Sequence, residues 1–544
     1  MTDSFRAVRR VVSIAGVGCL CLAAGRAPLA QKASRPGGLA AKIDAIVNRP
    51  LYRHGAFGIE FLSLDTGQPI YTRNADKLFT PASTTKLLTE GTALHLLGAD
   101  YRFHTRVYRT GPIAADGTLD GDLVLVASGD PDLSNRIQPD GTLAFENEDH
   151  AYDGSPDTKA VPGDPLLVIR ELASQIAAHG VKRIDGRVMV DASLFPEGTR
   201  ELGTGTVLSP VVVNDNVIDV TLTPAATAGQ PPAMRVSPET AYVQFSNAVT
   251  TGKADSKVDV KFDRDVTHDD GSHSVTVSGS MPAGGPAILF AYRVTAPSRF
   301  AAMALAQALQ EKGIAAMAAP PDATPDFAAL AASYTPDAMV AEHVSPPFSE
   351  EVKVTLKVSQ NLHASLTPYL LGALVAHAKT KILQAGFDQE HTFLAGAGLD
   401  LTGASQGDGA GGALSAFFTP DFMVHYLAFM AKQPDFAVFE RALPVLGRDG
   451  TLWNIETDSP AAGHVHAKTG TFGAFNNLNR GLMLTAKGLA GYMTTADGRH
   501  LAFAIYANRV PLPREDDPLK VEKQIDDVGQ ALGEIAAAAY TTPR

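Results

Sequence analysis

One short stretch, Pro81-Ala82-Ser83-Thr84-Thr85-Lys86, sets the strictest condition on the fold of this chain. Pro81 stands where a helix can begin, and apolar residues recur with helical spacing after Lys86. A helix that starts near Ala82 places Ser83 and Lys86 on one face, one turn apart. A lysine whose pKa is lowered by burial can remove the proton of a serine and make it a nucleophile. The alternative is a surface helix that carries these residues by chance.

Two later segments complete a three-part pattern. Ser359-Gln360-Asn361 lies between predicted helices over 350–358 and 362–378, and Lys468-Thr469-Gly470-Thr471 precedes a strand-rich C-terminal region. Ser-x-x-Lys, Ser-x-Asn and Lys-Thr-Gly, in this chain order, form the signature of the penicillin-binding proteins and serine β-lactamases. Each part is common by chance, but the ordered set is not. Because Ser359 follows Ser83 by 276 positions, the chain between them is long enough for one or two inserted domains.

The order of the predicted elements indicates an α/β fold, in which an antiparallel sheet with helices is assembled from both ends of the chain. The signature implies that this is the transpeptidase-like domain of penicillin-binding proteins and serine β-lactamases. We expect it to comprise residues 39–100 and 341–544. Residues 101–340 then form the insertion, with a nested β-rich module at about 205–290. The insertion is expected to contain strands over 103–109, 121–127, 184–191, 217–223, 257–262 and 273–277, and helices over 165–179 and 297–313.

Segment 135–164 is acidic, rich in proline and glycine, and poor in apolar residues. This composition is typical of a long surface connection, so we predict an exposed loop. A second loop, 403–412, is rich in glycine. The C-terminal part alternates strands over 488–494 and 501–507 with a closing amphipathic helix over 521–540.

Residues 1–30 predict an export signal. Three arginines precede an apolar run over 11–24, which is shorter than the roughly 20 residues that a membrane span needs. We therefore expect cleavage near Ala30 and no membrane span in the mature protein. Lipidation at Cys19 or Cys21 is the alternative, but the residues before each cysteine match a lipidation site poorly.

Composition excludes several classes of protein. With 544 residues, 45% apolar and 19% charged, the chain can bury large cores. A net charge of −12 argues against a nucleic-acid partner, because phosphate binding needs a basic surface. Both cysteines lie in the predicted signal, so the mature protein cannot use disulfides.

No zinc signature is evident in the sequence. His464 and His466 are two positions apart without a third ligand nearby, and His391 follows Glu390 without a second ligand at helical spacing. We expect no metal and no other cofactor.

Further segments point to one family. They are Gly121-Asp122-Leu123, Ser128-Gly129-Asp130-Pro131, Val190-Asp191-Ala192-Ser193-Leu194-Phe195, Val213-Asn214-Asp215-Asn216, Leu443-Pro444-Val445, Asp449-Gly450-Thr451-Leu452, Gly491-Tyr492 and Thr495-Ala496-Asp497-Gly498-Arg499. Together with the three motifs, they make most of the mature chain resemble the D-alanyl-D-alanine carboxypeptidase/endopeptidases of the penicillin-binding protein 4 type, peptidase family S13. The long insertion also fits this family better than the compact β-lactamases.

The resemblance implies a periplasmic enzyme that acts on the peptide stems of peptidoglycan and is inhibited by β-lactam antibiotics. By resemblance, Ser83 attacks the carbonyl of a D-Ala-D-X bond and forms an acyl-enzyme, with Lys86 as the acylation base. Ser359 relays a proton toward the leaving nitrogen, and Asn361 holds the substrate backbone and orients Lys86.

The third motif is expected to bind the substrate. By resemblance, Lys468 places positive charge near the substrate carboxylate and Ser359, and Thr469, Gly470 and Thr471 bind that carboxylate. The N–H groups of Ser83 and Thr471 form the oxyanion hole.

Asp191 has two interpretations. In some members of the family an acidic residue near this place reads the amino end of a diaminopimelate side chain, but Asp191 also fits a strand-end aspartate that caps a turn. The sequence departs from the family pattern at Gln360, where aspartate is often found. It departs again at Gly396-Ala397-Gly398-Leu399, which lacks the usual serine and puts any role of that serine in doubt.

Two alternatives to the leading hypothesis stay open at this point. A β-lactamase or esterase on the same site would need fast deacylation, and a non-catalytic peptidoglycan-binding protein would keep the fold without turnover. The sequence leaves open the choice between trimming terminal D-Ala and cutting cross-links, together with the stem-peptide chemistry and the oligomeric state.

Overall fold

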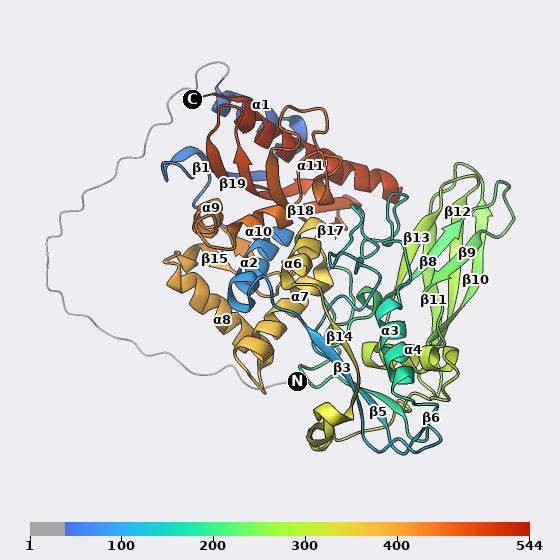
Figure 1. Ribbon diagram of the computed structural model, residues 1–544. Helices are drawn as coiled ribbons and strands as arrows, with labels where there is room; N and C mark the ends of the chain where they lie inside the picture. Colours follow the sequence, from blue (N-terminus) through green and yellow to red (C-terminus); the bar gives the residue numbers. More distant parts are fainter. Residues whose placement is uncertain (1–37, 544) are drawn as a thin grey trace, which may run out of the picture.

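The computed structural model describes residues 38–543, so the predicted export signal lies outside the described residues. Within this range no helix combines the length and apolar character needed to cross a membrane. Both chain ends contribute to a body of sheet and helices, and the inserted residues extend from it on one side (Figure 1).

A five-stranded antiparallel sheet unites the two ends of the chain. Its strand order is β17-β18-β19-β1-β2, and Ile59 of β1 faces Ile505 of β19 in the register. The prediction of an antiparallel sheet built from both chain ends is thereby confirmed. The strands are β1 (Ala56–Ser63), β2 (Pro69–Arg73), β17 (Val465–Asn476), β18 (Gly481–Thr494) and β19 (His500–Pro511).

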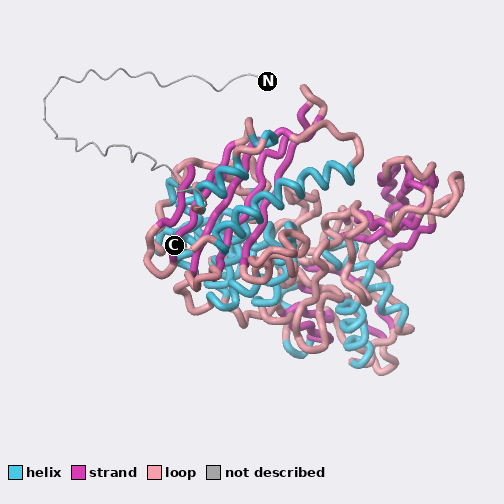
Figure 2. Tube along the Cα trace, turned by 90° about the horizontal axis from the view of Figure 1, so that it is seen from above, coloured by secondary structure: helices cyan, strands magenta, loops and turns pink. Residues whose placement is uncertain are grey.

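Helices cover both faces of this sheet. Successive side chains of β19 point to opposite faces, and both sets are apolar and need a covering layer. Phe503 and Ile505 share a core with α1 (Leu39–Val47) and α11 (Pro518–Thr541) on one face. Seen from above, these two helices lie across the strands (Figure 2). Tyr506 packs on the other face, against the helical layer that carries the first two motifs. That layer contains η2 (Ala82–Thr85), α2 (Lys86–Leu97), α6 (Phe348–Lys357), α7 (Asn361–Leu370), α8 (Ile382–Gly396), α9 (Pro420–Met430) and α10 (Phe436–Ala442).

Two of the predicted helices differ in detail. The Ser83 helix begins as a 3₁₀ turn, Ala82–Thr85, before it continues as α2. The helix predicted over 362–378 ends at Leu370 and passes into a π-type turn, Leu371–Val375. Pro368 stands just before this change and cannot donate an intrahelical hydrogen bond.

The insertion contains a four-stranded sheet in the order β14-β3-β5-β7, with α3 and α4 packed against it, and two three-stranded sheets in the orders β10-β12-β11 and β13-β8-β9. β14 pairs with β3, so the last strand before the second motif belongs to the same sheet as the first strand after the Ser83 helix. The predicted domain boundaries stay predictions. The elements are β3 (His104–Arg109), β4 (Thr118–Leu119), β5 (Leu123–Val126), α3 (Leu167–Ala178), β6 (Arg183–Ile184), β7 (Val188–Asp191), β8 (Val217–Thr223), β9 (Ala233–Ser237), β10 (Val243–Gly252), β11 (Asp259–Thr267), β12 (His273–Pro282), β13 (Ile288–Arg293), α4 (Pro297–Glu311) and β14 (Met339–Val344).

The prediction that segment 135–164 is an exposed loop is wrong about its exposure. The segment has no long helix or strand, but Arg136, Asp149 and His150 are only 1–4% exposed. Arg136 pairs with Asp149 inside the segment, and Arg136 and His150 pair with Asp215 outside it, which is why polar composition here does not mean exposure.

Candidate active site

The first catalytic pair is formed locally. Ser83 lies in the 3₁₀ turn and is half-buried, and Lys86 begins α2 with no exposed surface. The Nζ atom of Lys86 lies 2.8 Å from the Oγ atom of Ser83. This is hydrogen-bond distance, so a proton can pass between the two groups.

The environment of Lys86 prepares it to act as a base. Its Nζ also donates to the Oδ1 atom of Asn361 at 2.7 Å and to the carbonyl of Ala410 at 3.2 Å. Burial lowers the pKa of Lys86 to about 7, against the opposing effect of the Asp408, Glu201 and Glu90 carboxylates. Near neutral pH a large share of Lys86 is therefore the free amine.

A second serine–lysine pair faces the first. The Oγ atom of Ser359 lies 2.8 Å from the Nζ atom of Lys468, which is completely buried. Burial and the nearby charges of Lys86 and Lys487 hold the pKa of Lys468 well below its usual range. Ser359 has a backbone φ of 63°, a left-handed conformation that costs a residue other than glycine about 1–2 kcal/mol. Such strain persists only where the surroundings enforce it.

The third motif lies on β17, at the edge of the sheet beside Ser83. Thr469 donates its hydroxyl to the Oγ1 atom of Thr451 at 2.7 Å. A Cβ atom at Gly470 would lie 2.5 Å from the carbonyl oxygen of Pro81 and 3.2 Å from the backbone nitrogen of Ser83. Glycine at this position therefore lets the strand approach the turn that carries the nucleophile.

One cavity of about 390 Å³ is lined by Ser83, Ser359, Asn361, Thr469 and Thr471, and the two lysines contact the serines of this lining. The structure thus brings together Ser83, Lys86, Ser359, Asn361, Lys468, Thr469, Gly470 and Thr471. Three further parts of the chain complete the wall: Asn147, Glu148 and Tyr152 of segment 135–164, residues after Thr451, and one face of α11.

Asp191 lies elsewhere. It ends β7, where its carboxylate accepts hydrogen bonds from the backbone N–H of Ser193 at 3.0 Å and from the hydroxyl of Tyr334 at 2.9 Å. It lines a different cavity, together with Lys379. The geometry fits a strand-end aspartate that caps a turn, and a role for Asp191 in binding substrate stays a prediction.

Sequence reasoning missed the support beneath Lys86. Asp408, in the glycine-rich loop, accepts hydrogen bonds from the backbone N–H groups of Gly411 and Gly412. Gly411 has a φ of 87°, and a Cβ atom there would lie 2.0 Å from the carbonyl oxygen of Ala82. The small residues of loop 403–412 could have indicated this contact, because they permit close approach of one backbone to another.

An antiparallel sheet with two opposed serine–lysine pairs at its edge defines an active-site-serine hydrolase of the penicillin-binding and serine β-lactamase class. The sequence profile of the D-Ala-D-Ala carboxypeptidase 3 (S13) family matches residues 39–532. The chain belongs to this family, which confirms the resemblance, and it is a serine-type D-Ala-D-Ala carboxypeptidase.

Curated relatives agree with this assignment, and solved structures agree with the fold. The D-alanyl-D-alanine carboxypeptidase of Actinomadura sp. (strain R39) is 28% identical over 514 residues, which cover 91% of this chain and 84% of the relative. D-alanyl-D-alanine carboxypeptidase DacB of Haemophilus influenzae is 23% identical over 461 residues, 82% of this chain and 84% of the relative. The crystal structure of penicillin binding protein 4 (dacB) from Haemophilus influenzae covers 90% of this chain and 98% of its own, with a TM-score of 0.67 at 20% identity. A structure of that protein with a β-lactam has a TM-score of 0.64 at 19% identity and covers 92% and 99% of the two chains.

Proposed function

We propose that this carboxypeptidase cleaves the D-Ala-D-X bond of peptidoglycan stem peptides in the periplasm, through an acyl-enzyme on Ser83. The observation that carries the proposal is the buried Lys86 amine, 2.8 Å from Ser83, together with the Ser359–Lys468 pair, whose serine lines the same cavity as Ser83.

In the acylation step, Lys86 takes the hydroxyl proton of Ser83 as its Oγ attacks the substrate carbonyl carbon. The backbone N–H groups of Ser83 and Thr471 receive the oxyanion. When the C–N bond breaks, Ser359 gives its proton to the leaving nitrogen and regains one from Lys468. Water then hydrolyses the ester: the ammonium of Lys86 returns its proton to the Oγ atom of Ser83, one proton of the water recharges Lys468, and the shortened peptide leaves as its free acid.

In this scheme Lys468 takes up a proton from the solvent when the substrate binds. A carboxylate bound beside Thr469 and Thr471 raises the pKa of Lys468, which burial otherwise lowers. The ammonium that results both holds the carboxylate and supplies the proton that Ser359 passes on.

The cavity also favours action on cross-links, because it continues past Thr469 to Asn454 and Glu522. A volume of about 390 Å³ exceeds what a single leaving alanine fills. We therefore propose both carboxypeptidase and endopeptidase activity, with the larger leaving group in this extension.

Intact-mass measurement with benzylpenicillin tests the acyl-enzyme. The wild-type protein is expected to gain the mass of one penicillin, and Ser83→Ala is expected to gain none. Destruction of the penicillin without a lasting adduct would favour the β-lactamase alternative. Untouched penicillin and unmodified protein would overturn the proposal of an acyl-enzyme on Ser83.

The pH dependence of acylation is expected to follow Lys86. Its pKa of about 7 predicts that the rate is half-maximal near pH 7 and falls about tenfold per pH unit below that, as the amine is protonated. Asp408→Asn removes the carboxylate that most opposes the effect of burial, so the Lys86 pKa drops and the midpoint moves to lower pH. Stopped-flow acylation between pH 5 and 9 measures both midpoints, and a shift to higher pH in Asp408→Asn would contradict this account.

A further inference from the structure

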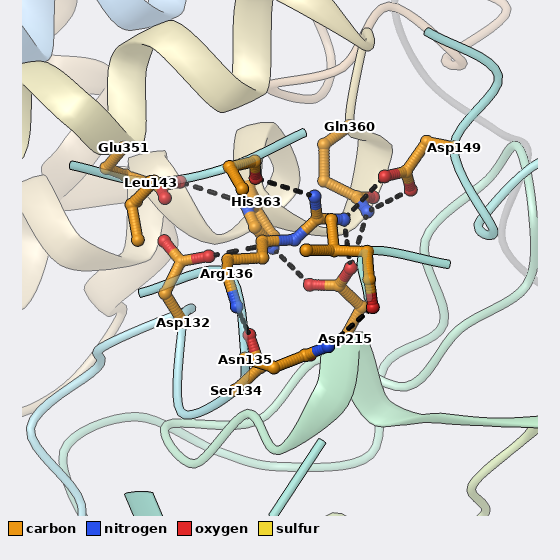
Figure 3. Close-up of polar contacts among 12 residues, drawn as sticks. Asp132, Ser134, Asn135, Arg136, Leu143, Asp149, Asp215, Glu351, Gln360 and His363 are labelled. Carbon is orange, nitrogen blue, oxygen red and sulfur yellow. Dashed lines mark hydrogen bonds and ion pairs between the residues drawn. The ribbon is translucent and has the colours of Figure 1, made fainter. Parts of the chain in front are cut away.

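Charged side chains with almost no exposed surface connect segment 132–164, which extends the acidic stretch by three residues, to the rest of the molecule. Figure 3 shows the polar contacts among them. The guanidinium of Arg136 donates to Asp149 and to Asp215, each at 2.6 Å. These three residues are 1–2% exposed, and Asp215 comes from a different part of the insertion. The anchor therefore joins the acidic segment to the rest of the molecule.

Two histidines complete the cluster. His150 contacts Asp215 at 2.6 Å and Asp219 at 3.0 Å, and His363 contacts Asp215 at 2.8 Å and Glu351 at 3.0 Å. The carboxylates hold the pKa of both histidines well above the usual range, so three cations sit among the acidic groups.

The cluster also contains two sets of ligand atoms close enough for a metal ion, Asp132–Asp215–His363 and Asp149–His150–Asp215. Arg136 and the two imidazoles already take up the Asp215 carboxylate of both sets. A metal ion would have to displace the guanidinium from Asp215 and remove protons from the imidazoles, so the geometry favours a structural anchor.

Gln360 connects the cluster to the second catalytic motif. Its side-chain Nε2 lies 3.4 Å from Asp149 and 3.3 Å from Asp215, and its Oε1 accepts the backbone N–H of Leu362. A glutamine can donate to these two carboxylates, whereas an aspartate at this position would repel them. Glutamine at residue 360, where the family often has aspartate, is therefore compatible with the carboxylates of the cluster that it contacts.

Tyr152 makes the second connection. Its hydroxyl donates to the backbone carbonyl of Ser359 at 2.5 Å. Its ring is 37% exposed and lines the cavity that contains Ser83. Tyr152 is therefore placed to hold the left-handed turn at Ser359, whose side chain contacts Lys468.

We propose that segment 132–164 is a built-in part of the active site, in which the Arg136 cluster and Gln360 dock the segment and Tyr152 positions Ser359 for proton transfer to the leaving nitrogen. Tyr152 is a positioning residue, since it acts through Ser359. The inference rests on the proposed function, because it assigns a task to the proton relay.

Substrates with different leaving groups distinguish a loss of Ser359 positioning from a general loss of activity. A D-Ala-D-Ala peptide needs a proton on its leaving nitrogen, whereas a thioester analogue expels a thiolate that needs none. For Tyr152→Phe we expect kcat/KM to fall about tenfold on the peptide and less than threefold on the thioester. Tyr492→Phe also removes a hydroxyl that donates to a backbone carbonyl, that of Leu427, but Tyr492 does not line the cavity. It is the matched control and should match the wild type on both substrates.

Each outcome bears on one claim. Equal losses on both substrates, or no loss on either, would overturn the positioning role of Tyr152. Failure of the wild-type protein to acylate Ser83 would overturn the proposed function instead. Thermal unfolding of both variants checks that their folds are intact.

Discussion

Replacing Lys86 by methionine is expected to slow the acylation of Ser83 by about 10³-fold, the scale of a lost general base. Methionine is unbranched and fills a similar buried volume, but it cannot accept the serine proton. The Asn361 amide oxygen and the carbonyl of Ala410 also lose their donor. The rate is measured from the growth of the penicillin adduct by intact mass.

Lys357→Met is the matched control for this substitution. Lys357 is also buried, at 5% exposed, but its Nζ contacts the carboxylate of Asp449 at 2.7 Å and no serine. We expect its acylation rate to stay within about threefold of the wild type. If Lys86→Met retained more than a tenth of the wild-type rate, another group would have to serve as the base.

Replacing Arg136 by methionine is expected to reduce the free energy of unfolding by about 3–5 kcal/mol. The substitution leaves the carboxylates of Asp149 and Asp215 buried beside each other without the guanidinium that joins them. Urea unfolding followed by tryptophan fluorescence measures the loss. Trp453 is the only tryptophan in the chain, and its indole N–H donates to Glu148 of the acidic segment, so its emission reports undocking directly.

Two further variants test the reason for this loss. Arg136→Lys keeps the charge but gives up the planar fork of donors, so it should fall between the wild type and Arg136→Met. In the double variant Arg136→Met/Asp149→Asn, the carboxylate that loses its ion pair with Arg136 is gone, while Asp215 keeps its two histidines, and stability should recover by at least about 1 kcal/mol. An unchanged urea midpoint in Arg136→Met would show that the cluster contributes nothing to stability.

The parts of the site that sequence could predict are those with local or motif-encoded geometry. Helical spacing alone places Ser83 beside Lys86, and the ordered motifs identify Ser359 and Lys468 as the second pair. The strand pattern near both chain ends likewise predicted the antiparallel sheet, because alternation is a property of each strand by itself.

The parts that sequence could not predict depend on partners far along the chain. Arg136 looks solvent-exposed among acidic neighbours, and only the fold brings Asp215 to it, 79 positions away. His363 meets the same carboxylate from 148 positions away. No sequence pattern predicts the contact of Tyr152 either, because its hydroxyl donates to the backbone carbonyl of Ser359, which any residue at that position would offer. The cavity that Asp191 lines also depends on distant residues, since Lys379 forms part of its wall.

The strand order β17-β18-β19-β1-β2 also has a consequence for how the protein comes into being. β1 is synthesised early, but its neighbour β19 lies close to the other end of the chain. One edge of β1 therefore stays unpaired until synthesis is nearly complete. The insertion can bury its own core in the meantime, because its sheets pair within residues 104–344. The hydrolase is therefore assembled last, and a chain that stops short of β19 leaves a folded insertion attached to an unfinished, aggregation-prone sheet.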